Sequence, residues 1–327
     1  MRKILSVLLI LSMLCAAAAC AQGVTVSDAA GRTVTLDSPP RRIVSGYYIT
    51  TSMLIALGLK DNLVGIEAKA QERNLYRLTA PELMTLPDTG TAKNFQLEAC
   101  LSLAPDLVIL PIKLKSAAED LNGFDIKTVL VNPENAENLL DTIRMLGTLC
   151  GAAEQADVLI SACDALQNEL TNRLMTADKP SVYLAGNSSV LETAANSMYQ
   201  TSLITLGGGR SVTDDLDGST WVSISYEQLL NMNPDYIILS SDAVYTVQDV
   251  LDDPMLSYLS AVQSKRVFRL PGAVEAWDSP VPATMLGSLW IAKTLHPNLV
   301  TEELYLDSAV RFYETFYHFS PDRKQLK

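Results

Sequence analysis

Histidine is scarce in this chain of 327 residues, which has only His296 and His318, both near the C-terminus. A bare transition-metal ion is usually held by clustered His, Cys or carboxylate side chains. The sequence therefore disfavours a free zinc or manganese ion and predicts no metal ligands. Beyond the N-terminus the cysteines are Cys100, Cys150 and Cys163, without the CxxC spacing of a zinc or redox site. We expect them to be buried, without a disulfide framework.

Positive charge is also limited. The chain has 25 Lys and Arg against 37 Asp and Glu, a net charge of −12, and it has no basic run that could follow a phosphate backbone. Nucleic acid is therefore not an expected partner.

Motifs of common enzyme classes are missing too. The chain has no Gly-Lys-Ser/Thr phosphate loop, no Gly-x-Ser-x-Gly nucleophile elbow and no His placed to activate a Ser or Cys. We expect a binding protein that needs no cofactor, not an enzyme.

Long apolar runs are absent beyond the first residues. Residues 1–19 combine two basic residues, a short apolar run and small residues, which predicts a signal peptide. No later stretch reaches the roughly 18 apolar residues of a membrane helix. The segment Ala-Ala-Ala-Cys that ends at Cys20 is similar to a lipobox, although Ala17 replaces the usual Leu, and it predicts a lipoprotein on the cell membrane. Ordinary cleavage, giving a free periplasmic protein that starts near Gln22, stays open.

The rest of the chain predicts an α/β fold with two lobes. Its length suits two domains of about 150 residues, and an N-terminal hairpin is expected over 24–36. Short apolar runs then alternate with helix-like segments, which is typical of parallel sheets. The predicted strands are 42–45, 63–66, 107–110, 128–131, 182–184, 236–239 and 267–270. We expect an N-terminal lobe over 24–150, one long interlobe helix within 151–177, and a C-terminal lobe with terminal helices over 180–327.

One short sequence motif, called the repeated phrase below, occurs twice, once in each predicted lobe. Glu98 is followed seven residues later by Pro105, and Glu227 is followed seven residues later by Pro234. In both copies the proline is followed by Asp and then by an apolar run. This pattern predicts a short helix that begins with an acid, ends at the proline and leads at once into a buried parallel strand.

With this repeat and several other phrases, the chain resembles the periplasmic binding proteins for iron siderophores, haem and cobalamin nearly end to end. The resemblance implies two Rossmann-like lobes joined by a single long helix. It also implies the extracytoplasmic solute-binding component of an ABC importer, a monomer that captures an iron chelate (siderophore), haem or a corrinoid and delivers it to the permease and its ATPase. The other phrases are Val26-Ser-Asp-Ala-Ala-Gly31-Arg32, Pro40-Arg-Arg-Ile-Val44, Leu206-Gly-Gly208, Ala261-Val262 and Arg266-Val267.

The two acids of the repeat have an expected role in docking. In the family that the chain resembles, one acidic residue on each lobe binds in a basic pocket of the permease. The matching positions in this chain are Glu98 and Glu227. The alternative is that both acids only cap their helices.

The ligand is expected in a cleft between the lobes, because ligands of open parallel sheets bind beyond the carboxyl ends of the strands. Aromatic rings offer flat apolar faces, and arginine offers a fork for anionic groups. The candidate ligand-binding residues are Tyr47, Tyr48, Arg73, Tyr76 and Arg77 in the first lobe, and Asn187, Tyr199, Trp221 and Trp277 in the second. The alternatives are that the aromatics are half-buried loop residues and that Arg73 and Arg77 form a solvated helix face.

A rival interpretation assigns the chain to another functional class, an enzyme or a sensor. An exported enzyme or a sensor on the same two-lobed fold could act on a tetrapyrrole or metal chelate, because a fold does not fix a function. Multiple turnover on a bound tetrapyrrole would favour the enzyme, and stoichiometric binding would favour transport. Siderophore, haem, corrinoid and oxyanion binders share the scaffold, so the sequence does not single out one ligand.

Overall fold

The computed structural model describes residues 23–327. The predicted signal peptide and the predicted lipidation site, Cys20, lie outside this range. Within the described range no helix is both long and apolar enough to cross a membrane.

The first lobe holds a parallel sheet of four strands in the order β4 (Leu63–Gly65), β3 (Ile43–Ser45), β7 (Leu107–Pro111) and β8 (Lys127–Val131). The predicted hairpin precedes it as β1 (Val24–Ser27) and β2 (Thr33–Leu36). Every residue of β7 is buried, as an apolar run between two layers requires. The other elements of this lobe are α2 (Tyr48–Ala56), α3 (Asn74–Thr79), β5 (Gly90–Thr91), β6 (Asn94–Phe95), α4 (Leu97–Ser102), α5 (Lys115–Gly123) and α6 (Ala136–Leu149).

The second lobe has a six-stranded mixed sheet. Strands β9 (Ser181–Ala185), β13 (Tyr236–Leu239) and β14 (Val267–Arg269) are parallel, as predicted. Beyond β9 the sheet continues with antiparallel β10 (Glu192–Ala194) and β12 (Trp221–Ser223), while β11 (Arg210–Ser211) also pairs with β9. The sequence did not predict these three short strands. The helices of the lobe are α8 (Tyr199–Leu206), α9 (Tyr226–Met232), α10 (Val247–Asp252) and α11 (Ser260–Gln263).

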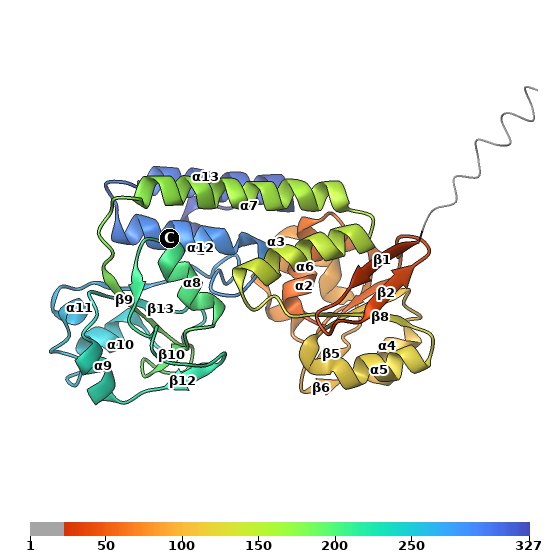
Figure 1. Cartoon of the computed structure of the whole chain (residues 1–327), viewed down its shortest axis with the longest axis horizontal. Helices are drawn as coiled ribbons and strands as arrows, with labels where there is room; N and C mark the ends of the chain where they lie inside the picture. The colour runs from red at the N-terminus through yellow and green to blue at the C-terminus, as the bar shows by residue number, and fades with distance from the viewer. Residues whose placement is uncertain (1–22) are drawn as a thin grey trace, which may run out of the picture.

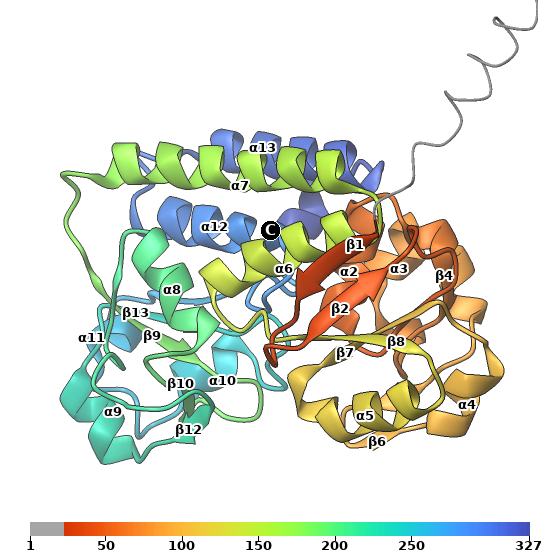
Figure 2. The ribbon, with the colours of Figure 1, turned by 45° about the vertical axis from the view of Figure 1, so that its right-hand side comes forward.

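A layer of long helices joins the lobes. Helix α7 (Ala153–Leu174) runs above both of them, which confirms the predicted interlobe helix, and α12 (Met285–Leu295) and α13 (Glu302–Tyr317) lie along it (Figures 1 and 2). Helix α13 also packs on α2 of the first lobe. One hydrophobic cluster contains Met53, Leu159 and Leu286, from α2, α7 and α12. The lobes are therefore joined in two ways, by the covalent connection through α7 and by a hydrophobic core that the terminal helices share with the first lobe.

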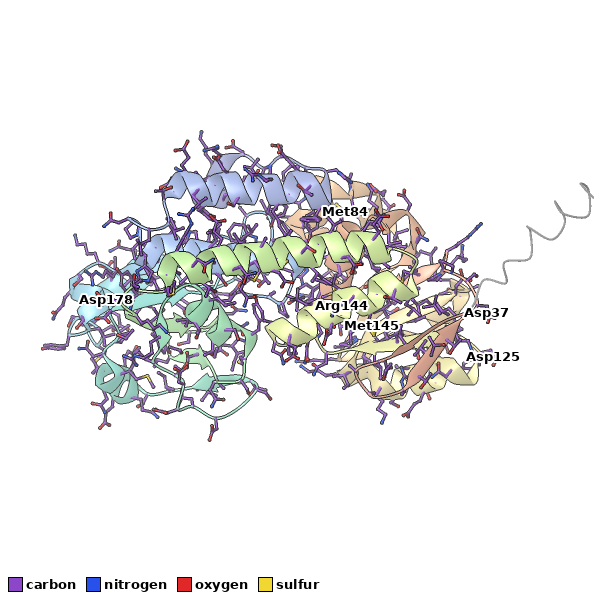
Figure 3. The ribbon with its side chains drawn as sticks, turned by 45° about the horizontal axis from the view of Figure 1, so that its top comes forward. Asp37, Met84, Asp125, Arg144, Met145 and Asp178 are labelled. Carbon is purple, nitrogen blue, oxygen red and sulfur yellow. The ribbon has the colours of Figure 1, made fainter. Side chains whose placement is uncertain are left out.

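Charged side chains lie on the surface of α6, which packs on α7, and in the turn after α7. Arg144 on α6 is exposed and forms an ion pair of 2.6 Å with Asp141, one helical turn away (Figure 3). Asp178 lies in the turn after α7, where the chain enters the second lobe (Figure 3).

The three described cysteines are free and buried, as predicted.

The repeated phrase has the same structural role in both lobes. The Asp106 carboxylate accepts hydrogen bonds from the backbone N–H groups of Arg41 and Arg42, both at 2.9 Å, just before β3. The Asp235 carboxylate accepts from the backbone N–H of Ser181 at 2.8 Å, at the start of β9. Each aspartate thus fixes the start of the neighbouring parallel strand, which explains why it directly follows the proline.

Candidate functional site

A pocket of about 110 Å³ lies between the two lobes. The first lobe supplies the start of α2 and the segment that enters α3, and the second lobe supplies the loops after β13 and β14. The lining residues are Tyr48, Glu72, Arg73, Asn74, Leu75, Asp242, Gly272, Val274, Glu275, Ala276 and Val281. The pocket is therefore at the carboxyl ends of strands from both sheets, where the sequence predicts the ligand cleft.

Direct hydrogen bonds hold the lobes together around this pocket. The Tyr48 hydroxyl donates to Ser279 Oγ at 3.1 Å, and the Asn74 side-chain amide donates to the Ala273 carbonyl at 3.1 Å. Each of these bonds joins a residue of the first lobe to the loop after β14. The pocket is thus bounded by both lobes.

Arg73 is the basic residue of the pocket lining. Its guanidinium carbon lies 4.1 Å from the centroid of the Tyr48 ring, a cation–π contact that orients the side chain. Its Nε is buried and has no hydrogen-bond partner among the described residues. Burial raises the pKa of Tyr48 above its ordinary value, so the ring stays neutral beneath the cation. Arg73 therefore has donor capacity left for a ligand.

Glu275 lines the pocket from the second lobe. Its Oε1 accepts a hydrogen bond of 2.5 Å from Ser52 Oγ of α2, and its Oε2 is buried without a partner. Burial raises the pKa of this carboxyl to about 7, against the opposing effects of the Ser52 hydrogen bond and the Arg73 charge. Two more carboxylates, Glu72 and Asp242, line the pocket but are exposed, and Glu72 is paired with Lys69 at 3.6 Å. Solvent screens such exposed charges.

Of the predicted ligand-binding residues, the structure brings Tyr48 and Arg73 into this pocket. Tyr47 stacks edge-on against Tyr48 with ring centroids 5.4 Å apart, and its hydroxyl donates to Glu134 at 3.1 Å. Arg77 is exposed, and its guanidinium donates to the Asn74 side chain and to a backbone carbonyl of its own segment. Arg77 does not line the interlobe pocket.

Three predicted contact residues lie in the hydrophobic core instead. Tyr76 is 1% exposed, Tyr199 is 2% exposed and Trp277 is 1% exposed. Their polar atoms are satisfied internally, for example by the bond of 2.8 Å from Trp277 Nε1 to the Tyr313 hydroxyl. None of the three lines the interlobe pocket in this structure, because burial of a large aromatic side chain in the core is strongly favourable.

Two other predicted residues lie in the second lobe, Asn187 after the central strand β9 and Trp221 on the edge strand β12. Asn187 follows β9, is half-buried, and accepts a hydrogen bond from Ser240 at the end of β13. Trp221 is half-buried on β12. Neither lines the interlobe pocket, and ligand contact by either one stays a prediction.

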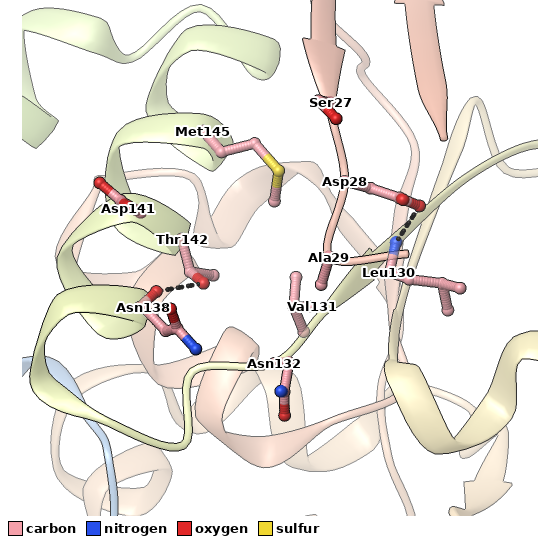
Figure 4. Close-up of a pocket in the computed structure, with 10 residues that line it drawn as sticks. All are labelled: Ser27, Asp28, Ala29, Leu130, Val131, Asn132, Asn138, Asp141, Thr142 and Met145. Carbon is pink, nitrogen blue, oxygen red and sulfur yellow. Dashed lines mark hydrogen bonds between the residues drawn. The ribbon is translucent and has the colours of Figure 1, made fainter. Parts of the chain in front are cut away.

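A second pocket, of about 230 Å³, lies wholly within the first lobe between β1, β8 and α6 (Figure 4). Asp28 points away from its centre, because its carboxylate accepts from the Leu130 backbone N–H at 3.0 Å and pairs with Arg32 at 2.7 Å. The Asp141 carboxylate at its rim is paired with Arg144. Since these charged groups are already engaged, the interlobe pocket is the better candidate. The other residues that line this second pocket are Ser27, Ala29, Val131, Asn132, Asn138, Thr142 and Met145.

Sequence reasoning missed Asn74, Asp242 and Glu275. For Glu275 a signal existed, because it is a single acid between the apolar residues Val274 and Ala276 in a loop that leaves a predicted strand. Asn74 and Asp242 are ordinary polar loop residues without such a signal. Among residues 23–327 no group of three or more His, Cys, Asp and Glu side chains is arranged to hold a metal ion.

Comparison with known proteins decides the family. The family described as periplasmic binding protein matches residues 43–274, well over half of the chain. The chain belongs to the periplasmic binding protein family.

The relatives of this periplasmic binding protein are binding proteins, not enzymes. The molybdate-binding protein MolA of Haemophilus influenzae is 27% identical over 329 residues, covering 91% of this chain and 92% of the relative. The vitamin B12-binding protein of Photorhabdus laumondii is 24% identical and covers 63% of this chain and 72% of the relative. A periplasmic solute binding protein from Veillonella parvula superposes with a TM-score of 0.82 at 26% identity, covering 93% of this chain and 95% of that structure.

The functional class follows from the family and the fold. The periplasmic binding protein is the solute-binding component of an ABC transporter, works with a permease and its ATPase, and binds a small solute. An extracytoplasmic location fits this family. The enzyme interpretation is therefore set aside.

Proposed function

We propose that this periplasmic binding protein captures a compact oxyanion in the interlobe pocket and delivers it to its permease. The observation that carries the proposal is the buried, unpartnered Nε of Arg73, on a guanidinium that is held over the Tyr48 ring. A guanidinium fork suits the oxygens of an oxyanion. The 27% identity to a molybdate-binding protein over nearly the whole chain supports the same ligand class.

The size of the pocket supports a compact ligand. Its volume of about 110 Å³ is well below the roughly 300–1,000 Å³ of sites for drug-sized molecules. The interlobe bonds from Tyr48 to Ser279 and from Asn74 to Ala273 close around this space. A tetrahedral oxyanion fits these bounds, whereas a haem or a corrinoid needs a wider separation of the lobes.

Titration of the purified protein with sodium molybdate tests this proposal. We expect Arg73→Ala to weaken binding at least tenfold, and Arg73→Lys to recover only part of the affinity, because an ammonium keeps the charge without the planar fork. Arg77→Ala is the matched control, since this arginine is four residues away and bonded to its own segment. Equal affinities of wild type and Arg73→Ala would contradict the proposal.

A larger metal-bearing ligand is the second candidate, as the sequence predicts: an iron chelate (siderophore), haem or a corrinoid. The relatives named for vitamin B12 and cobalamin favour it, and the half-buried rings of Tyr47 and Trp221 offer apolar faces. Native mass spectrometry with an absorption spectrum of the protein purified from its own source distinguishes the two candidates. A bound chromophore would favour this second ligand class over the oxyanion.

We further propose that Glu98 and Glu227 dock the protein on its permease. Both are exposed in the first turns of α4 and α9, at the end of each lobe away from α7 (Figure 2). Within residues 23–327 neither acid forms an ion pair. The capping alternative has little support, because Ser225 and Gln228 form the capping box of α9 and α4 has no side-chain cap.

The docking proposal is tested by transport in vesicles that contain the permease. Charge reversal in the double variant Glu98→Lys with Glu227→Lys should abolish uptake through repulsion at basic pockets, while ligand affinity stays near that of wild type. Glu154→Lys is the control, because this acid is exposed in the first turn of α7 on the opposite side. Normal uptake by the double variant would remove the docking role.

Lipid attachment at Cys20 and a monomeric state are also proposed. The support for the anchor is the lipobox-like sequence before Cys20. Mass spectrometry of the mature N-terminus should show an acylated cysteine that Cys20→Ala removes, and light scattering should give the mass of a single chain. An unmodified N-terminus near Gln22 would indicate free secretion.

A further inference from the structure

We infer that Glu275 is a second ligand-binding residue of the interlobe pocket, and that it donates a hydrogen bond to the bound oxyanion as a neutral carboxylic acid. The inference rests on the proposed oxyanion site. It adds a specific prediction to that site, because it makes oxyanion binding depend on the uptake of one proton.

Glu275 and Arg73 line the same pocket from different lobes. Arg73 belongs to the first lobe, and Glu275 follows β14 of the second lobe. Among the described residues that line the pocket, Arg73 Nε and Glu275 Oε2 are the two buried side-chain atoms without a partner. A buried polar atom without a hydrogen-bond partner is unfavourable, because it has lost its hydration. A ligand that bonds to both atoms removes this cost in each lobe at once.

The surroundings of Glu275 favour the neutral acid. The groups that face it are Ser52 of α2, the hydroxyls of Tyr313 and Tyr317 of α13, and Arg73. The lining acids Glu72 and Asp242 complete the charged groups of the pocket. Of these groups only Arg73 is positive, and burial still raises the pKa of Glu275 to about 7. A bound anion would raise it further, since two adjacent negative charges repel each other.

Proton and anion should therefore bind together. Below about pH 7 the carboxyl already carries its proton and can donate from Oε2 while Oε1 accepts from Ser52. Above that pH the site has to take up a proton before the anion binds well, so the apparent affinity falls as pH rises. The site thus selects solutes whose oxygens accept hydrogen bonds from both lobes, as those of a fully ionised oxyanion do.

The experiment is calorimetric titration with sodium molybdate from pH 6 to pH 8.5, repeated near pH 7.5 in buffers of different ionisation enthalpy. We expect uptake of up to one proton per molybdate and a loss of affinity that approaches tenfold per pH unit in the alkaline range. Glu275→Gln should abolish the proton uptake and the pH dependence, and it should retain binding at high pH because its amide donates permanently. Circular dichroism checks the fold of the variant.

Glu67→Gln is the matched control. Glu67 is the other buried glutamate whose pKa burial raises, but it bonds to Tyr76 and Thr51 and does not line the pocket. Proton uptake should persist in this variant. Binding by wild type without proton uptake, or uptake that survives Glu275→Gln, would overturn the role of Glu275 and leave the Arg73 site in place. Failure of wild type to bind molybdate at any pH would overturn both proposals.

Discussion

Single residues show how strongly burial competes with ligand binding. Trp277 follows a strand on the side of the cleft, which is where the sequence predicts a ligand contact. The structure turns its ring into the shared core, with its centroid 6.1 Å from that of Tyr305 and its Nε1–H bonded to Tyr313. Arg73 differs, because a charged head group cannot enter the core unpaired and is left in the pocket.

Trp277→Ala should therefore destabilise the protein rather than affect only the ligand. We expect the free energy of unfolding to fall by about 3–5 kcal/mol, as for other truncations of a buried aromatic. Trp277→Phe should cost less, and Tyr47→Ala should cost less as well because Tyr47 is half-buried. Urea unfolding followed by circular dichroism measures all three, and wild-type stability of Trp277→Ala would show that the ring is not a core element.

Glu275 should also make the stability of the ligand-free protein depend on pH. Because its pKa rises from 4.5 to about 7 on folding, the folded state binds more protons than the unfolded chain between these values. The free energy of unfolding should therefore be highest below about pH 4.5 for this group and decline as pH rises to 7, by up to roughly 3 kcal/mol. Urea unfolding at pH 5 and pH 7.5 checks this, and Glu275→Gln should reduce the difference. An equal difference in the variant would assign it to other groups.

At the scale of elements, the repeated phrase ends two short helices in the same way. The residue before each proline has a left-handed backbone, with φ of 44° at Ala104 and 38° at Asn233. Asparagine tolerates this conformation, whereas alanine carries a steric cost from its Cβ. The first copy of the phrase therefore contains a strained residue where the second does not.

Ala104→Gly should relieve this strain. Ala104 is exposed, so no packing is lost, and the free energy of unfolding should rise by about 0.5–1 kcal/mol. Ala117→Gly, inside α5, is the control and should lower it by about 1 kcal/mol, because glycine is unfavourable in a helix interior. Thermal unfolding compares the two, and destabilisation by both substitutions would contradict the strain at Ala104.

At the scale of the whole molecule, the helix layer should limit lobe motion. Helices α7, α12 and α13 share one core with α2, so wide opening of the lobes would expose apolar surface. We expect the radius of gyration from solution scattering to change by about 1 Å or less when molybdate is added. A compaction beyond about 2 Å would indicate a wide hinge and contradict the shared core.

Local patterns in the sequence alone determined much of this architecture. Each predicted parallel strand is a short apolar run beside turn residues, and α7 is a long strand-free segment, so the preference lies within a few neighbouring residues. The repeat is readable for the same reason, since its acid, proline and aspartate act on adjacent elements. These local signals were sufficient for the fold and the interlobe helix.

Tertiary structure alone decided the composition of the site. Arg73 and Glu275 come from different lobes, and no local pattern places them in one pocket. The same holds for Tyr76, Tyr199 and Trp277, whose directions depend on the core that α12 and α13 complete. Because burial is a property of contacts between distant segments, an aromatic residue has the same local signature whether its ring faces a ligand or the core.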